Sequence, residues 1–147
     1  MEREPVAMGH HTKEKGDLAV FKAEADMASQ GWMILRPMTE HAPFDIVIYR
    51  NCKFLTVQVK YTAMRNGKIE VKLSSCWGDK HGTHLVPIDC KIVNVYAIYC
   101  PDTDKCYYFR TKDFTKQCWV FLRIEEPRNN QSKNIRYASD YTFVPDP

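Results

Sequence analysis

The chain has 147 residues and a mass of 17.2 kDa, a size typical of one compact domain. Hydrophobic residues make up 44% and charged residues 27%, a balance that excludes intrinsic disorder, and the formal net charge of +3 permits a polyanionic partner without requiring one. No apolar run approaches the roughly 20 residues of a membrane-spanning helix, and the charged start at residues 1–5 is unlike a signal peptide. We therefore expect a cytoplasmic protein, not a membrane protein, with reduced thiols.

We expect a single domain over residues 1–147 that begins with a loose leader over residues 1–12. The first predicted element is a helix from Glu14 to Gln30, followed by Gly31 where a helix terminator belongs. A short apolar run from Trp32 to Leu35 suits a strand. The apolar side chains of the helix recur at helical spacing, at Leu18, Phe21, Ala25 and Ala28.

The strongest pattern is a pair of strands joined by a four-residue turn at 50–53. Residues 44–49 (FDIVIY) are apolar and β-branched, and residues 54–61 (FLTVQVKY) alternate with the two-residue period of a strand. After Asn66-Gly67, residues 68–73 (KIEVKL) alternate again and predict a third strand.

The second half of the chain predicts more strands and a polar tail. Residues 74–90 are polar and irregular, and the tail over residues 125–147 offers contacts to DNA or to a second copy of the chain. Further strands are expected at 92–100, 105–110 and 119–124, the first two joined by the turn residues 101–104. An early helix, three antiparallel strands and these later strands predict an α/β or α+β fold with a mixed sheet.

The first hairpin brings three chemically useful side chains together. Pairing Tyr49 with Phe54 places Asp45 opposite Gln58, with Cβ atoms about 4.5–5.5 Å apart, and alternation places Lys60 on the same face as Gln58. The oxygens suit a hard cation such as Mg²⁺ or Mn²⁺, and the lysine can orient or help deprotonate an attacking water. An ordinary solvated strand face also accommodates these residue types. The opposite face is apolar, with Ile46, Ile48, Leu55, Val57 and Val59.

Asp45, twelve intervening residues and Gln58-Val59-Lys60 resemble the PD-(D/E)XK nuclease signature, with glutamine in the second acidic position. The resemblance extends from about Thr12 to the tail and implies a restriction-endonuclease-like core, a mixed β-sheet flanked by helices. Four strings are similar to the PD-(D/E)XK endonucleases associated with group I introns, a branch in which this glutamine is usual: TKEKGDLAV (12–20), PMTEHAPFD (37–45), VQVKY (57–61) and YCPDTDKCYYF (99–109).

The resemblance implies a role for each residue of the motif. Asp45 is a metal ligand, Gln58 supplies a second oxygen near the metal, and the carbonyl of Val59 is a further ligand. Lys60 is the catalytic lysine. Together they imply phosphodiester hydrolysis with a bound divalent cation.

The resemblance also implies an acidic residue from the first helix, and here the chain departs from the family pattern. A related pattern, KGxxxE, would place the acid at Val20, which is not acidic. We expect Asp17 to take this role, with Glu24 and Glu14 as alternatives. An acid at Asp17 also suits a helix N-terminus, where the helix dipole stabilises negative charge.

Basic and amide side chains beyond the catalytic strand are candidates for contacts to phosphates and base edges. They lie in three segments, 61–72, 77–84 and 123–136, each of which is also compatible with an ordinary solvated surface. The candidates are Arg65, Lys68, Lys72, Lys80, His84, Arg123, Arg128, Asn130, Lys133 and Arg136.

One group of residues could instead form a structural metal site. The set Cys76, His81, His84 and Cys90 has the residue types of a structural zinc site, but its spacing matches no common zinc module.

The main hypothesis is a site-specific, homing-type endonuclease that cuts double-stranded DNA as a homo-dimer or homo-tetramer. The alternatives are a non-cleaving DNA-binding module of the same fold, a Holliday-junction-resolvase-like enzyme, and a structural or interaction protein.

Overall fold

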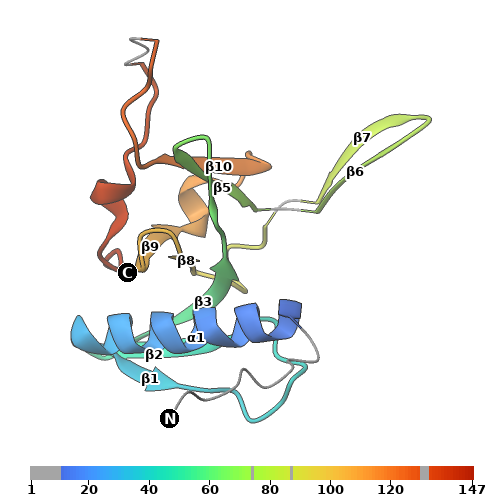
Figure 1. Ribbon diagram of the computed structural model, residues 1–147. Helices are drawn as coiled ribbons and strands as arrows, with labels where there is room; N and C mark the ends of the chain where they lie inside the picture. Colours follow the sequence, from blue (N-terminus) through green and yellow to red (C-terminus); the bar gives the residue numbers. More distant parts are fainter. Residues whose placement is uncertain (1–10, 74, 87, 130–132) are drawn as a thin grey trace.

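The computed structural model describes residues 11–73, 75–86, 88–129 and 133–147 (Figure 1). Of the leader expected over residues 1–12, residues 1–10 lie outside the described residues, as does the candidate Asn130, whereas His11 and Thr12 belong to the first helix, so the expectation was wrong for these two. Within them, the chain forms one α-helix, a five-stranded sheet, a three-stranded sheet and a two-stranded hairpin.

The five-stranded sheet has the order β1-β2-β3-β8-β9 and is mixed, as predicted. Its β3 and β8 run parallel, whereas the other neighbours are antiparallel. Its strands are β1 (Met33–Leu35), β2 (Ile46–Arg50), β3 (Lys53–Tyr61), β8 (Val95–Cys100) and β9 (Lys105–Arg110). The three-stranded sheet has the order β10-β5-β4, from β10 (Trp119–Arg123), β5 (Lys68–Lys72) and β4 (Met64–Arg65).

Helix α1 runs from His11 to Ser29, three residues longer at its start than predicted. It ends as expected at Gly31, whose φ of +86° places it in the left-handed region that favours glycine. The amide of Gly31 donates to the carbonyl of Ala28, and the amide of Trp32 donates to that of Met27. These two bonds form a Schellman motif, which satisfies carbonyls that the helix end would leave unpaired.

The buried face of α1 differs from the predicted one. Ala19, Ala23 and Met27 are buried, whereas Leu18 and Phe21 are exposed. Two small alanines let the helix backbone approach the sheet closely, so the stripe that carries them turns inward despite its small apolar area. The guanidinium of Arg36 lies 5.2 Å from the centre of the Phe21 ring, a cation–π contact at the surface.

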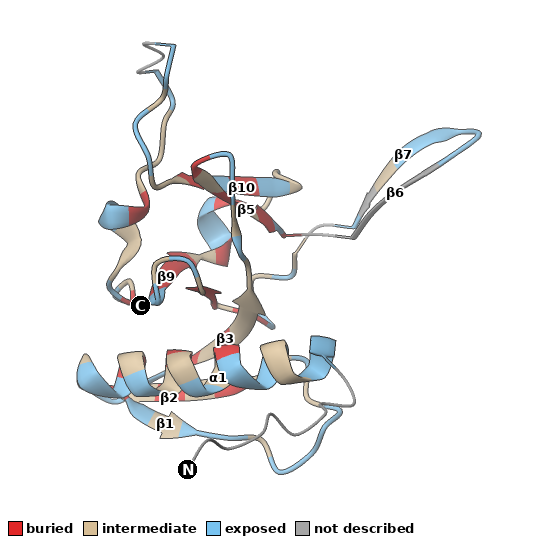
Figure 2. Ribbon diagram, in the orientation of Figure 1, coloured by how far each residue is buried: buried red, intermediate tan, exposed pale blue. Residues whose placement is uncertain are grey.

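Two buried clusters lie on opposite faces of the five-stranded sheet. The first lies between the sheet and α1 and includes Ile46 and Val57, and the second lies between the sheet and the three-stranded sheet and includes Ile69 and Leu122. All six residues of β8 are buried, because its alternate side chains enter the two clusters. The burial colours of Figure 2 follow this layering.

Two expectations about the strands were wrong. The third predicted strand, β5, does not pair with β3 but joins β10 and β4 in the separate sheet. The region 74–90, expected to be irregular, contains a hairpin of β6 (Ser75–Asp79) and β7 (Gly82–Val86) that projects from the body of the molecule (Figure 1). Local alternation predicts that a segment is a strand, but not which distant strand it meets.

The end of the polar tail packs against the body. After two short 3-10 helices, η1 (Thr111–Asp113) and η2 (Ala138–Tyr141), the side chain of Val144 enters the first cluster. The amide of Val144 donates to the side-chain oxygen of Gln30 at 2.8 Å. The final residues therefore help to hold the end of α1.

The structure tests two expectations from the sequence, that the thiols are reduced and that no helix spans a membrane. Thiols are free at Cys52, Cys90, Cys100 and Cys106, but Cys118 is disulfide-bonded, so the expectation of reduced thiols is wrong for this residue. No helix in the described residues has the length and apolar character to span a membrane.

We expect Ile48→Ala to destabilise the protein by about 2–5 kcal/mol, because truncation of a fully buried side chain leaves a cavity. Ile48 is completely buried between α1 and the sheet. Urea unfolding followed by circular dichroism measures the change. The matched control is Met33→Ala on neighbouring β1, where the side chain is 60% exposed and a change of under about 0.5 kcal/mol is expected. Equal effects of the two substitutions would contradict the layered core.

Candidate active site

The register of the first hairpin is the one that the sequence predicts. Tyr49 pairs with Phe54 and Ile46 pairs with Val57. The turn is shorter than predicted, since Arg50 and Lys53 also pair and leave only Asn51 and Cys52 between the strands. Both have positive φ, 51° and 61°, as in the type I′ turns that match the twist of a two-residue hairpin.

Asp45 precedes β2 and contacts the end of β3. Its Oδ2 accepts a hydrogen bond from Nε2 of Gln58 at 2.7 Å and one from the backbone amide of Val59 at 2.8 Å. Its own amide donates to the carbonyl of Val57 at 3.0 Å, which continues the β2–β3 pairing by one residue. The predicted neighbours Asp45 and Gln58 are therefore in direct contact.

Lys60 lies two residues beyond Gln58 on β3 and is half-buried. Its Nζ donates to the carbonyl of Lys72 on β5 at 2.8 Å and lies 5.3 Å from the centre of the Tyr96 ring. Burial lowers the pKa of Lys60, repulsion from the Lys72 ammonium lowers it further, and the Asp45 carboxylate acts in the opposite direction. The lysine ammonium therefore loses its proton more readily than the ammonium of a solvated lysine.

These side chains lie on the face of the sheet opposite α1. Lys60 contacts Tyr96 of the second cluster, whereas Val59 packs against the first. Over β8 and β9 this face is covered by the three-stranded sheet, but over β1 and β2 it is open, with Met33 60% exposed. The site lies at the boundary between the covered and the open halves, where a large substrate can approach.

Tyr96 was not among the predicted site residues. It pairs with Gln58 in the parallel register of β3 and β8, and its hydroxyl donates to the carbonyl of Leu73. Alternation over residues 92–100 reveals which side chains share a face, but the register of a parallel pair depends on a long connection. The ring is therefore a support for Lys60 that only the assembled sheet identifies.

The oxygens of this site fit a hard divalent cation. Both hydrogen bonds described for the Asp45 carboxylate end on Oδ2, which leaves Oδ1 for a ligand. Gln58 directs its amide nitrogen to Asp45, so its carbonyl oxygen is the group that remains to coordinate. Mg²⁺ commonly takes one or two protein oxygens and retains several waters, a demand that Asp45 and Gln58 meet.

The contacts described for two of the candidate helix acids, Glu24 and Asp17, lead to Arg36. Glu24 forms a two-pronged ion pair with Arg36, at 2.5 Å for each contact. Asp17 is exposed and acts electrostatically on the same arginine. Among the described residues there is no group of three or more His, Cys, Asp or Glu placed to hold a metal ion. The assignment of Asp17, Glu24 or Glu14 stays a prediction, and the zinc set is not tested because the side chain of Cys76 lies outside the described residues.

A family model for the PD-(D/E)XK endonuclease matches residues 10–144, nearly the whole chain. The chain belongs to the PD-(D/E)XK endonuclease family. Among solved structures, that of a bacterial homing endonuclease, I-Ssp6803I, is similar with a TM-score of 0.68 and 22% sequence identity. The similarity covers 90% of this chain and 88% of the other, and at this identity it shows the fold. No curated protein sequence matches the chain significantly.

Four of the residues predicted to contact DNA lie on one surface of this PD-(D/E)XK endonuclease. Side chains alternate in β5 and β10, so Ile69, Val71, Val120 and Leu122 point into the second cluster. The opposite face, which we call the outer face of the three-stranded sheet, carries the basic residues Arg65, Lys68, Lys72 and Arg123.

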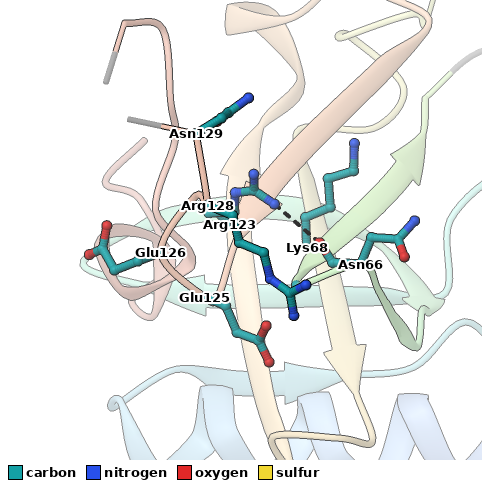
Figure 3. Close-up of a pocket in the computed structure, with 8 residues that line it drawn as sticks. Asn66, Lys68, Arg123, Glu125, Glu126, Arg128 and Asn129 are labelled. Atoms are coloured by element: carbon teal, nitrogen blue, oxygen red, sulfur yellow. Dashed lines mark hydrogen bonds between the residues drawn. The ribbon is translucent and has the colours of Figure 1, made fainter. Parts of the chain in front are cut away.

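The outer face continues into a cavity of about 440 Å³, drawn in Figure 3. Lys68, Arg123 and Arg128 supply positive charge to it, and Nη1 of Arg123 donates to the carbonyl of Asn66 at 3.1 Å. Figure 3 shows the carboxylate of Glu126 directed away from the side of Lys68. Glu125 also lines the cavity, so three cations and two carboxylates leave it a small positive excess that suits a phosphate.

The remaining basic candidates lie on the β6–β7 hairpin, which projects from the body (Figure 1), and in the segment after β10. Lys80 is exposed at the tip of the β6–β7 hairpin, where His84 is paired with Asp79 at 3.0 Å. Lys133 is exposed, whereas the Arg136 guanidinium lies 5.1 Å from the centre of the Phe114 ring. Of the nine described candidates, the structure thus places four on the outer face, Arg128 at the cavity, two on the β6–β7 hairpin, and Lys133 and Arg136 in the segment after β10.

Gly67 joins the sheet to the segment after β10. Its carbonyl accepts hydrogen bonds from the amides of Ile124 and Glu125, at 2.9 and 3.1 Å, and its φ is +73°. A Cβ at this position would lie 3.0 Å from Oε2 of Glu125 and 3.1 Å from its Cβ. The turn therefore requires glycine.

We expect Gly67→Ala to destabilise the protein by about 1–3 kcal/mol, because it adds a strained backbone to a close contact. Gly16→Ala is the matched control. Gly16 lies in α1 with nothing within 4 Å of an added Cβ, so alanine there should stabilise the helix by about 0.5–1 kcal/mol. Urea unfolding measures both changes, and a stabilising Gly67→Ala would refute the role given to this turn.

Proposed function

We propose that this PD-(D/E)XK endonuclease is a Mg²⁺-dependent enzyme that hydrolyses phosphodiester bonds in double-stranded DNA at specific sites, in the manner of a homing endonuclease. The observation that carries the proposal is the contact of Asp45 with Gln58 and with the amide of Val59. Lys60 follows on the same strand, and the site opens beside a basic sheet. This combination of metal-binding oxygens, a half-buried lysine and a basic surface suits a scissile phosphate.

Each residue has a distinct role in the proposed reaction. A bound Mg²⁺ would supply Lewis acidity at the scissile phosphate and a water of lowered pKa. Asp45 would hold the ion through Oδ1, Gln58 through its carbonyl oxygen, and the Val59 carbonyl is the further ligand proposed. The Val59 amide and the Gln58 side chain fix the Asp45 carboxylate from the other oxygen.

Lys60 would orient the attacking water and offset the charge that develops on the phosphate. Its position is fixed by the Lys72 carbonyl and the Tyr96 ring. Because burial lowers its pKa, the ammonium gives up a proton more readily than a solvated lysine. Asp17 is the proposed helix acid, with Glu24 and Glu14 as alternatives.

The DNA backbone would be held by the outer face, the cavity, the β6–β7 hairpin and the segment after β10. Lysine and arginine contacts to phosphates release counterions, so the affinity should fall steeply as salt is raised. The ten candidate residues are the ones we propose to make these contacts, with Asn130 outside the described residues.

We also infer that the enzyme acts as a homo-dimer or homo-tetramer. One chain carries one proposed site, and cleavage of both strands is simplest with two sites related by two-fold symmetry. Exposed apolar side chains at Met33 and Phe54 border a shallow cavity next to β1, whose outer edge has no strand partner among the described residues. Light scattering that gives a monomer with and without DNA would exclude this assembly.

Cleavage of a mixed duplex library tests the function directly. The wild type should cut with Mg²⁺ or Mn²⁺ and stop when EDTA removes the ion, and sequencing of the ends should reveal a common site. Binding without cleavage would favour a non-cleaving module, an alternative that Val20 in place of the helix acid and Gln58 in place of a carboxylate support. Cutting confined to four-way junctions would favour the Holliday-junction-resolvase-like alternative.

A further inference from the structure

The outer face of the three-stranded sheet carries two large aromatic side chains that the proposed function leaves unexplained. Trp119 and Phe121 are 42% and 44% exposed, whereas Val120 and Leu122 between and beside them are buried. This alternation along β10 is visible in Figure 2. A buried inner face would hold the sheet together without aromatic residues on the outside, so the two rings are available for a partner.

The two rings are arranged as a stacking surface. Their planes are almost parallel, with an interplanar angle of 8° and ring centroids 6.5 Å apart. Nζ of Lys68 lies 4.7 Å from the centre of the Phe121 ring. Parallel rings allow both side chains to take part in one stack of planar groups, and nucleic-acid bases are planar groups with an accessible π-face.

The charges around the rings are mostly positive. Lys72 pairs with Trp119, Glu70 with Phe121, and Lys68 with Arg123 across the β5–β10 ladder. On the other side of β5, Arg65 pairs with Lys68. Four cations and one carboxylate therefore share this face, and the carboxylate is within 3.5 Å of the Lys68 ammonium. The occupant that such a surface complements is an anion that carries flat rings.

The aromatic pair is close to the proposed catalytic site. Lys60 donates its hydrogen bond to the carbonyl of Lys72, the residue that pairs with Trp119. Only the backbone of β5 separates the lysine from the outer face. A strand of DNA held at the site can therefore reach this surface within a short length of backbone.

We propose that Trp119 and Phe121 form a platform on which unpaired bases of the DNA substrate stack, with Lys68, Lys72 and Arg123 holding the adjacent phosphates. The platform thus binds a single-stranded segment, opened or already unpaired, beside the scissile bond. Aromatic and basic side chains on a sheet face are a recurrent means of binding single strands. The inference rests on the proposed function in taking DNA as the substrate, and it adds the strand class that the enzyme holds.

Fluorescence anisotropy with the full chain and EDTA tests the platform without cleavage. The probes are a labelled oligothymidine, a duplex, and the same duplex with a central unpaired bubble. Trp119→Ala and Phe121→Ala should each weaken binding to the oligothymidine and the bubble about tenfold, with a smaller effect on the duplex. Trp119→Phe should retain most of the affinity that Trp119→Ala loses. Phe143→Ala removes an exposed aromatic side chain near the end of the chain, to which no role is assigned, and is the control that should leave all three affinities unchanged.

Three outcomes would overturn the platform: no binding of single strands by the wild type, equal losses for the duplex and the single strand, or altered self-association of Trp119→Ala with unchanged DNA affinity. Failure of the proposed function is read separately, from Mg²⁺-dependent cleavage by the wild type. Ring-dependent binding of single strands by a chain that never cuts would uphold the platform and reject the nuclease. If both alanine variants still cut DNA and bind single strands with unchanged affinity, the platform is rejected and the nuclease is upheld.

Discussion

Replacement of Asp45 by asparagine is expected to reduce Mg²⁺-dependent cleavage about 1000-fold while DNA binding is retained. The substitution keeps the shape of the side chain but removes the negative charge that would hold the cation. A bound cation contributes several kcal/mol to the stabilisation of transition-state charge, which corresponds to about three powers of ten in rate. Single-turnover cleavage of the preferred duplex, with enzyme in excess, measures the change.

Asp113→Asn is the matched control for the Asp45 substitution. Asp113 lies in η1 and pairs with Arg110 at the surface, away from the proposed site, so the rate should not change. Thermal unfolding of the Asp45 variant shows whether the hydrogen bonds from Gln58 and Val59 still hold the β2–β3 end together. Undiminished cleavage by a folded Asp45→Asn variant would remove this residue from the catalytic centre.

Lys60→Met is expected to lower the cleavage rate at least about 100-fold, the lower range for a side chain that assists proton transfer. Methionine preserves the length and apolar stem of the side chain, so packing against Tyr96 should persist. The carbonyl of Lys72 loses its described donor, and a modest decrease in the unfolding temperature should accompany the loss of rate. The affinity for DNA in EDTA should change much less than the rate.

Lys53→Met separates a catalytic effect from a general loss of positive charge. Lys53 is exposed at the opposite end of the same strand, in the ladder pair with Arg50. The substitution should leave the cleavage rate unchanged. It should weaken DNA binding by no more than the loss of one exposed positive charge. Equal reductions in rate for both variants would mean that Lys60 acts only through the net charge of the protein.

The central part of the site was predictable because it depends on local geometry. A tight turn sets the register of the two strands that it joins, and the two-residue period then decides which side chains share a face. The positions of Asp45 and Gln58, and of the apolar residues behind them, follow from these two rules. The contact of Oδ2 with both Gln58 and Val59 refines that arrangement.

The family resemblance reached further than spacing alone could, and the family model confirms it over residues 10–144. It correctly implied a mixed sheet and a nuclease family. It also implied an acid from α1, and there the residues of this chain differ from the pattern at Val20. The described contacts of Glu24 direct it to Arg36 instead. Which acid completes the site is thus a question for substitution of Asp17, Glu24 and Glu14.

The sequence by itself determined the helix, most strands of the two larger sheets, the register of the first hairpin and the motif, since propensity, turn chemistry and alternation act over a few residues, but it did not predict the β6–β7 hairpin. Only the tertiary structure decided that β5 joins a second sheet, that α1 buries Ala19 and Ala23 rather than Leu18, and that Lys60 is held by Tyr96 and Lys72. Each of these depends on contacts between segments far apart in the chain. Local patterns specify which faces of an element are apolar. Which of these faces is buried, and which distant segment covers it, depends on how closely the two backbones can pack.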